Sequence, residues 1–276
     1  MKIVSLSNVD STIYKGLAIM MIMLHNYLHV FPLPKENEFS FNREYFDAFL
    51  TLLLSEPESI IRITFSYFGH YGVQIFVFLS AYGLAIKYLD KRVKYRLFVF
   101  ERLWKIYPAF LLSLAAWFTL RAAWYSLNGT LGDADFKLEA VILKLTLFPN
   151  VFPNYALSPV GPWWFLPFIF QFYLVLPLLL RLYASMGNKF LIVVSISSFI
   201  ASIAIENIGY TAIYYNIPPY MPIFCFGIYL AKISANELRV SPFVLLSVLN
   251  RNTINLRAFK VNLIFFTIFF NLCHFQ

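Results

Sequence analysis

The sequence has few charged residues for its length, and this scarcity excludes an ordinary water-soluble domain. Only 13% of its 276 residues are charged, whereas 60% are hydrophobic. Soluble domains average about 25% charged and about 45–50% apolar residues. Aromatic residues are abundant, with 31 Phe and 18 Tyr, and they suit lipid-facing surfaces and the aromatic belts at membrane interfaces. The composition therefore predicts an integral membrane protein.

Cysteines and the signature motifs of many soluble enzymes are also scarce. The two cysteines, Cys225 and Cys273, lie within apolar segments, where we expect small core residues and not a disulfide. No group of cysteines and histidines has the spacing of a zinc site, so we predict no bound metal. Neither a glycine-rich phosphate loop nor a GxSxG nucleophile motif occurs. Any chemistry is therefore left to residues in or beside the apolar segments.

Seven stretches of the chain have the length and apolar character of membrane spans. A span needs about 20 helical residues, because a helix rises about 1.5 Å per residue through about 30 Å of hydrocarbon. We therefore predict an all-α polytopic membrane protein, a single domain over residues 1–276 with a bundle of about seven or more transmembrane helices. The predicted spans are 13–31, 68–88, 103–124, 163–183, 190–206, 211–231 and 259–275.

Basic residues are concentrated between the second and third predicted spans. The positive-inside rule assigns that segment, and with it the N-terminus, to the cytoplasm. The acid-rich segment 32–66 and the segment 125–162 then lie outside, where long apolar loops are expected to act as lids or re-entrant elements. The net charge of +8 reflects this topology and contact with membrane lipids, and we predict no nucleic-acid partner.

The first predicted span carries polar residues that an inert anchor would not need, namely Lys15, His25, Asn26 and His29. A fully charged side chain costs about 2.5–3.5 kcal/mol at the centre of a span, so such residues indicate a functional site. His25 and His29 are four residues apart and share a helix face. His70 and Gln74 begin the second span from the same external side, so we expect these side chains to converge. An interfacial histidine, satisfied by backbone or lipid headgroups, is the alternative for His70.

No Asp or Glu lies in the interior of any predicted span. Within the membrane, histidine is therefore the plausible general base near pH 7.

Near the cytoplasm, Arg102 and Lys105 lie one turn apart and suit a phosphate or pyrophosphate group. Ordinary flanking basic residues in contact with lipid phosphate explain this pair equally well. Trp164 is either part of an interfacial belt or a platform for a sugar ring.

Several motifs occur in an order that resembles the membrane acyltransferase-3 family, whose members O-acylate sugars of envelope polysaccharides and lipid-linked glycans. The likeness covers residues 10–235 and leaves 236–276 atypical. It is carried by Lys15-Gly-Leu-Ala with His25-Asn26, by Tyr71-Gly-Val-Gln74-Ile-Phe-Val-Phe-Leu-Ser80-Ala-Tyr-Gly, by Arg102-Leu-Trp-Lys105-Ile-Tyr-Pro108, by Trp164-Phe-Leu with Gln171-Phe-Tyr173 and Pro177, and by Pro222 with Gly227 and Ala231.

The chain departs from the family pattern in several ways. Nine residues separate Lys15 from His25 where the family usually has ten, so either His25 works with a shifted partner or His29 takes part. Lys105 stands in place of the second arginine of the cytoplasmic motif, and Ile169 stands where an acid is often found. The chain also has fewer predicted spans than family members usually have, which raises the alternative of a shortened, inactive member.

The resemblance implies a bacterial inner-membrane O-acyltransferase, with a hydroxyl of an envelope polysaccharide or lipid-linked glycan as the acceptor. It implies an acyl-CoA donor, in the first instance acetyl-CoA, and no tightly bound cofactor. His25 would be the general base or a transient acyl carrier, and Lys15, Arg102 and Lys105 would bind the donor. The side chains implied to line the site are Asn26, His29, His70, Gln74, Ser80, Trp164, Gln171 and Tyr173. An exporter of polysaccharide or lipid-linked sugar without transferase activity is a further alternative, and the sequence predicts no oligomeric state.

Overall fold

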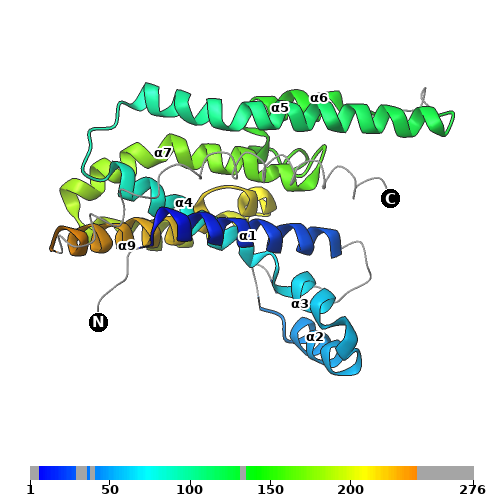
Figure 1. Ribbon diagram of the computed structural model, residues 1–276, viewed down its shortest axis with the longest axis horizontal. Helices are drawn as coiled ribbons and strands as arrows, with labels where there is room; N and C mark the ends of the chain where they lie inside the picture. Colours follow the sequence, from blue (N-terminus) through cyan, green and yellow to red (C-terminus); the bar gives the residue numbers. More distant parts are fainter. Residues whose placement is uncertain (1–5, 29–35, 38–40, 131–134, 241–276) are drawn as a thin grey trace.

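Every regular element in the part of the chain that the structure describes is a helix (Figure 1). The structure is a computed structural model and describes residues 6–28, 36–37, 41–130 and 135–240. Three short helices, α2 (Arg43–Ser55), α3 (Ile60–Phe68) and α6 (Leu138–Leu145), lie in the two long connections. The long helices are α1 (Asn8–Leu28), α4 (Tyr71–Tyr88), α5 (Tyr95–Leu127), α7 (Phe165–Met186), α8 (Asn188–Asn207) and α9 (Met221–Val240).

Helices occupy six of the seven predicted spans, and the seventh, 259–275, lies outside the described residues. Among the described helices, α5, the segment Gly161–Met186 and α8 are each long and apolar enough to cross a membrane. α3 and α4 make a fourth if they form one span, although they meet at a bend of 54°. The prediction of an all-α polytopic membrane protein is confirmed.

One predicted span begins too early. The stretch predicted from residue 211 opens instead with two short 3₁₀ turns, Thr211–Tyr215 and Pro218–Tyr220, and α9 starts at Met221. Pro218 and Pro219 have no backbone N–H and fix the φ angle, so they interrupt an apolar run that reads as continuous. α9 is correspondingly shorter at its beginning than the hydropathy of the sequence suggests.

α4 lies at the centre of the bundle and packs against both α1 and α9. The contact with α9 is very close because residue 227 is glycine. A Cβ added to Gly227 would lie 2.9 Å from both the Cβ of Ala81 and the carbonyl oxygen of Phe78. The start of α1 is also tied to α4, since the backbone N–H of Leu6 donates to the hydroxyl of Tyr82 at 3.3 Å. The central position of α4 makes it the common wall of the sites described below.

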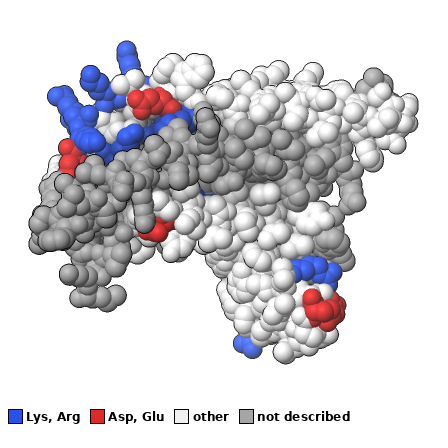
Figure 2. Space-filling view, viewed as in Figure 1, with Lys and Arg blue, Asp and Glu red and all other residues white. Residues whose placement is uncertain are grey.

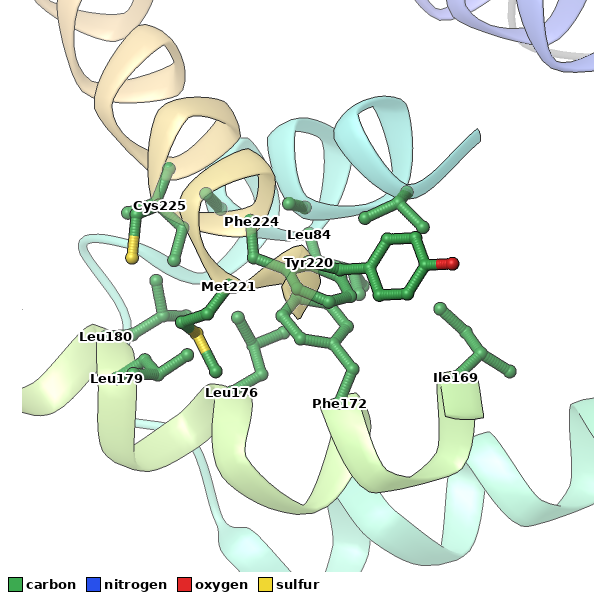
Figure 3. Close-up of a cluster of buried hydrophobic side chains, with 14 of the residues drawn as sticks. Leu84, Ile169, Phe172, Leu176, Leu179, Leu180, Tyr220, Met221, Phe224 and Cys225 are labelled. Atoms are coloured by element: carbon green, nitrogen blue, oxygen red, sulfur yellow. The ribbon is translucent and has the colours of Figure 1, made fainter. Parts of the chain in front are cut away.

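α7 packs onto α9 through large apolar side chains (Figure 3). The rings of Phe172 and Phe224 stack with their centroids 3.6 Å apart, and Leu176 is buried in the same cluster. Such an aromatic pair contributes about 0.5–1.5 kcal/mol beyond the area that it buries. The packing fixes the rotation of α7, so that Tyr173, the neighbour of Phe172, turns toward Arg102 of α5.

Lysine and arginine side chains gather at one end of the molecule (Figure 2). α4 ends there, α5 begins there and α7 returns there (Figure 1). We call this the basic end and the opposite end, where α2 and α3 protrude, the far end. That the basic end faces the cytoplasm stays a prediction. Its exposed basic residues include Lys87, Lys91, Arg92, Lys94, Arg96, Arg181 and Lys189.

Candidate functional site

The helical segment that carries His70 is broken at a glycine, and α1 packs against the break. α3 ends at Phe68 and α4 begins at Tyr71, so Gly69 and His70 form the bend. A Cβ on Gly69 would lie 2.6 Å from the Cβ of His25 and 2.7 Å from the carbonyl oxygen of Met21. Real Cβ atoms essentially never come so close, so a larger residue at position 69 would force α1 away.

His25 is buried in this contact, with 8% of its surface exposed. Its Nδ1 lies 2.8 Å from the carbonyl oxygen of Ser66, in the last turn of α3. The ring of His70, which is also buried, meets the His25 ring edge to face, with the centroids 5.5 Å apart. The structure thus brings together two predicted site residues that come from different predicted spans.

The Ser66 contact determines which nitrogen of His25 can act as a base. A carbonyl oxygen only accepts hydrogen bonds, so the hydrogen must be on Nδ1. In the neutral ring, Nε2 then carries the lone pair. A buried histidine held in this tautomer is prepared to accept a proton at Nε2, which is what a general base does.

Three other predicted site residues of α1 and α4 do not take part in the contact between the two histidine rings. Asn26 donates from Nδ2 to a backbone carbonyl one turn earlier in α1, at 2.8 Å. Gln74 lines an apolar groove of about 460 Å³ and, with its amide turned, donates to the carbonyl oxygen of His70 at 2.8 Å. Ser80 is buried ten residues beyond His70, about 15 Å away by helical rise. His29 lies outside the described residues.

A second cluster surrounds Arg102, nearer the basic end. Arg102 is 7% exposed, and its guanidinium lies 5.0, 5.6 and 5.9 Å from the ring centroids of Phe98, Tyr173 and Tyr88. It also donates from Nη2 to the hydroxyl of Tyr88 at 3.2 Å. A cation over an aromatic face is stabilised by about 0.5–2 kcal/mol, depending on how far it is desolvated. The aromatic cage therefore holds a charge that would otherwise be costly to bury.

Lys15 reaches toward this second cluster. Its Nζ lies 3.9 Å from the position that a Cβ on Gly83 would occupy, close to the basic end of α4. Lys15 and Arg102 lie close enough for their positive charges to repel each other. His25 lies ten residues further along α1, about 15 Å from Lys15 by helical rise. Lys105 is exposed whereas Arg102 is buried, but the two positive charges lie close enough to repel each other.

Trp164 and Gln171 belong to a third group, built from buried amides at the far end. Gln171 donates from Nε2 to Oδ1 of Asn216 at 2.7 Å, and Asn216 donates to the carbonyl oxygen of Asn150 at 2.9 Å. Asn150 is fully buried and donates to the carbonyl oxygens of Trp164 and Tyr215, at 2.8 and 2.6 Å. These bonds tie the segment before α7 to the turns before α9.

Sequence reasoning missed several of these residues. Ser66 contributes a backbone carbonyl, which no sequence pattern marks. Tyr88 and Phe98 could not be distinguished by residue type, because 20% of the residues in this chain are aromatic. Asn150 and Asn216 offered a usable signal, because each is an isolated amide among aromatic residues and prolines.

One more ionisable group is buried outside the predicted spans. Lys144 of α6 has no exposed surface, and its Nζ donates to the carbonyl oxygens of Ala156 and Tyr155 at 2.8 and 3.4 Å. Burial lowers the pKa of Lys144 to about 7. The bonds fasten α6 to the segment that leads into α7. Among the described residues, no three His, Cys, Asp or Glu side chains form a possible metal site.

The sequence matches the family model of the acyltransferase-3 family, described as an acyltransferase domain, over residues 10–274. This match confirms the resemblance that the motifs indicate, and it extends beyond residue 235, where the motifs end. Searches of curated proteins and of solved structures gave no match. The matched range is nearly the whole chain, and the chain therefore belongs to the acyltransferase-3 family.

Proposed function

We propose that the protein is a membrane O-acyltransferase that moves an acyl group, in the first instance acetyl, from an acyl-CoA to a hydroxyl of an envelope polysaccharide or lipid-linked glycan. The family match supports acyl transfer in general. Within the site, the observation that carries the proposal is the buried His25 ring, whose Nδ1 bonds to the Ser66 carbonyl at 2.8 Å. A thioester donor is already activated, so the reaction needs no tightly bound cofactor.

His25 is proposed to act as the general base. Its Nε2 takes the proton of the acceptor hydroxyl as the hydroxyl oxygen attacks the thioester carbonyl. The carbon–sulfur bond then breaks, and the departing CoA thiolate takes the proton back from the imidazolium. The products are an ester and free CoA, and the histidine returns to its starting state. A positioned general base typically contributes about 10²–10⁴-fold to the rate.

The donor is proposed to enter at the basic end, which faces the cytosol of a bacterial inner membrane in this proposal, with the N-terminus on the same side. Lys15, Arg102 and Lys105 are proposed to supply positive charge along the path that the donor takes into the bundle. The thioester arm of the donor then extends along α1 over the roughly 15 Å of helical rise between Lys15 and His25. His25 and Arg102 are both buried, so the proposed path begins and ends inside the bundle.

The acceptor is proposed to approach from the far end. The helix break, with its two buried histidines, faces α1 there, and α2 and α3 protrude next to it (Figure 1). Trp164 and Gln171 stand at the start of α7, at the same end of the bundle. The buried amides behind them hold this region in one conformation, which suits a surface that has to place a sugar hydroxyl.

Acetyl transfer in membranes that contain the wild type or His25→Ala tests the proposal, with labelled acetyl-CoA as donor and the host glycans as acceptor. We expect label in glycan with the wild type and about 10²–10⁴-fold less with the variant. Met20→Ala, at an exposed position of the same helix, is the matched control and should retain transfer. Equal transfer by His25→Ala at equal protein level would remove His25 from the reaction. Movement of unmodified glycan without any label would favour an exporter.

A further inference from the structure

We propose that a basic pocket beside the Arg102 cluster binds the adenosine 3′-phosphate 5′-diphosphate part of the donor, and that Arg181 selects the 3′-phosphate. This proposal rests on the acyl-CoA donor of the function proposed above. The pocket has a volume of about 410 Å³ and lies between the end of α4, the turn that follows it and the last turns of α7. Small-ligand sites commonly have volumes of about 300–1,000 Å³.

The charge of the pocket is strongly positive. Lys91, Arg92 and Arg181 line it, and no carboxylate stands among the described residues of its wall. Asp90, the acid next to Lys91 in sequence, forms an ion pair with Lys232 of α9 at 3.7 Å. The nucleotide part of CoA carries a diphosphate and a separate ribose phosphate. Arginine binds phosphate oxygens through two parallel hydrogen bonds, which gives Arg92 and Arg181 geometric selectivity as well as charge.

The remaining wall of the pocket is apolar and suits a purine. Tyr88 lines it together with four apolar residues, Leu89, Val93, Pro177 and Leu180. Every nucleobase has a π-face that stacks on an aromatic or apolar surface. A pocket that combines cations with apolar and aromatic residues matches the phosphates and the base of an adenine nucleotide.

Tyr88 connects this pocket to the interior of the bundle. Tyr88 lines the pocket, and its hydroxyl accepts the hydrogen bond from Nη2 of Arg102 at 3.2 Å. Arg102 itself is buried behind Tyr88 and is not part of the wall. Arg102 therefore positions Tyr88, while Arg181 is exposed and can meet phosphate from the solvent.

Direct binding of adenosine 3′,5′-bisphosphate tests the pocket without requiring acyl transfer. The full-length protein in phosphatidylcholine nanodiscs is titrated with this probe by calorimetry. We expect the wild type to bind, Arg181→Gln to raise the Kd about tenfold or more, and Arg181→Lys to recover part of the loss. Lys189→Gln is the matched control, because Lys189 is an exposed cation at the same end that does not line the pocket. Equal affinities for the wild type and Arg181→Gln would overturn the proposal.

An anionic lipid headgroup offers the same phosphate chemistry, so a second titration uses discs that contain phosphatidylglycerol. Bisphosphate binding that depends on Arg181 and that the lipid weakens by competition would support the nucleotide site. Arg181-dependent retention of phosphatidylglycerol, with no bisphosphate binding in phosphatidylcholine discs, would assign the pocket to lipid and overturn the nucleotide proposal.

Donor kinetics then separate this proposal from the proposed function. Arg181→Gln should raise the KM for acetyl-CoA about tenfold with little change in kcat. It should leave the KM for 3′-dephospho-acetyl-CoA unchanged, because that donor lacks the selected group. Binding of the bisphosphate through Arg181 in a protein that transfers no acyl group would keep the pocket and reject the transferase. Acyl transfer by a wild type whose KM values for the two donors are equal would keep the transferase and reject the selection of the 3′-phosphate.

Discussion

The His25 ring is held by two partners from one broken helix: the Ser66 carbonyl oxygen lies 2.8 Å from Nδ1, and the centroid of the His70 ring lies 5.5 Å from that of His25. Both partners come from the segment on which α1 packs at Gly69. The carbonyl determines the tautomer, and the neighbouring ring limits rotation. The break between α3 and α4 therefore orients the proposed base, and it does so with backbone as well as side chains.

Replacement of His70 by alanine should lower kcat and leave the KM for the donor nearly unchanged. His70 positions the His25 ring and contacts it far from the donor-binding residues. An aromatic edge contact is worth about 0.5–1.5 kcal/mol, which corresponds to about a 2–10-fold loss in rate. His70→Phe, which keeps a ring edge, should recover most of the rate in steady-state assays. A loss as large as that of His25→Ala would instead give His70 a direct chemical role.

Gly69→Ala should displace α1 and lower both stability and activity. Its Cβ would collide with the carbonyl oxygen of Phe65 and would lie 2.6 Å from the Cβ of His25, and neither atom belongs to a flexible side-chain end. Overpacking of this kind costs about 1–3 kcal/mol. Gly83→Ala in the same broken segment is the control, because its Cβ would make an ordinary contact at 3.9 Å with the end of Lys15. Apparent Tm values that fall equally for both variants would contradict the close packing.

Arg102→Lys should be more damaging than Lys105→Arg, although both exchange one cation for the other. Arg102 is buried among three aromatic rings and donates to Tyr88, and an ammonium group cannot reproduce a planar guanidinium there. Lys105 is exposed and has room for a larger head. We expect Arg102→Lys to lower the apparent Tm and to raise the donor KM several-fold. Lys105→Arg should leave the apparent Tm unchanged and alter the donor KM by no more than about twofold. Thermal scans and donor titrations of the two variants compare them directly, and equal effects would argue against the cage.

Much of the fold was predictable from sequence because length and hydropathy are direct physical requirements of a membrane span. The start of α9 was not, since prolines inside an apolar run change its backbone without changing its hydropathy. The bend at Gly69 and His70 was missed for a related reason. A glycine in an apolar run occurs both in continuous helices and at bends, and only the helix packed against it distinguishes the two cases.

The candidate site was predictable only where a rare residue type marks it. His25 and His70 were predicted to converge, because polar residues are uncommon in this chain and both lie in apolar runs. Their orientation depends on the carbonyl of Ser66, and carbonyls are present at every position. The aromatic cage was hidden by the abundance of aromatics, and Arg181 was hidden among other basic residues that flank the predicted spans.

Lys144 should make the stability of the protein depend on pH in a defined window. Its pKa is lowered from 10.5 to about 7 in the folded protein, because burial disfavours the charged form. Between these pH values, the unfolded chain binds more protons at this position than the folded chain does. The free energy of unfolding therefore rises with pH across the window, by at most about 1.4 kcal/mol per pH unit for one proton.

Lys144→Met removes this titration and keeps a side chain of similar length. The apparent Tm of the wild type relative to Lys144→Met should therefore increase as the pH is raised from 7 to about 10. Lys137→Met is the matched control, because Lys137 directly precedes α6 and is exposed, so its removal should leave the pH dependence of the wild type unchanged. A Tm difference between the wild type and Lys144→Met that is flat across this range would mean that Lys144 stays protonated when folded. Its two carbonyl partners, at 2.8 and 3.4 Å, would then be solvating an ammonium ion inside the protein.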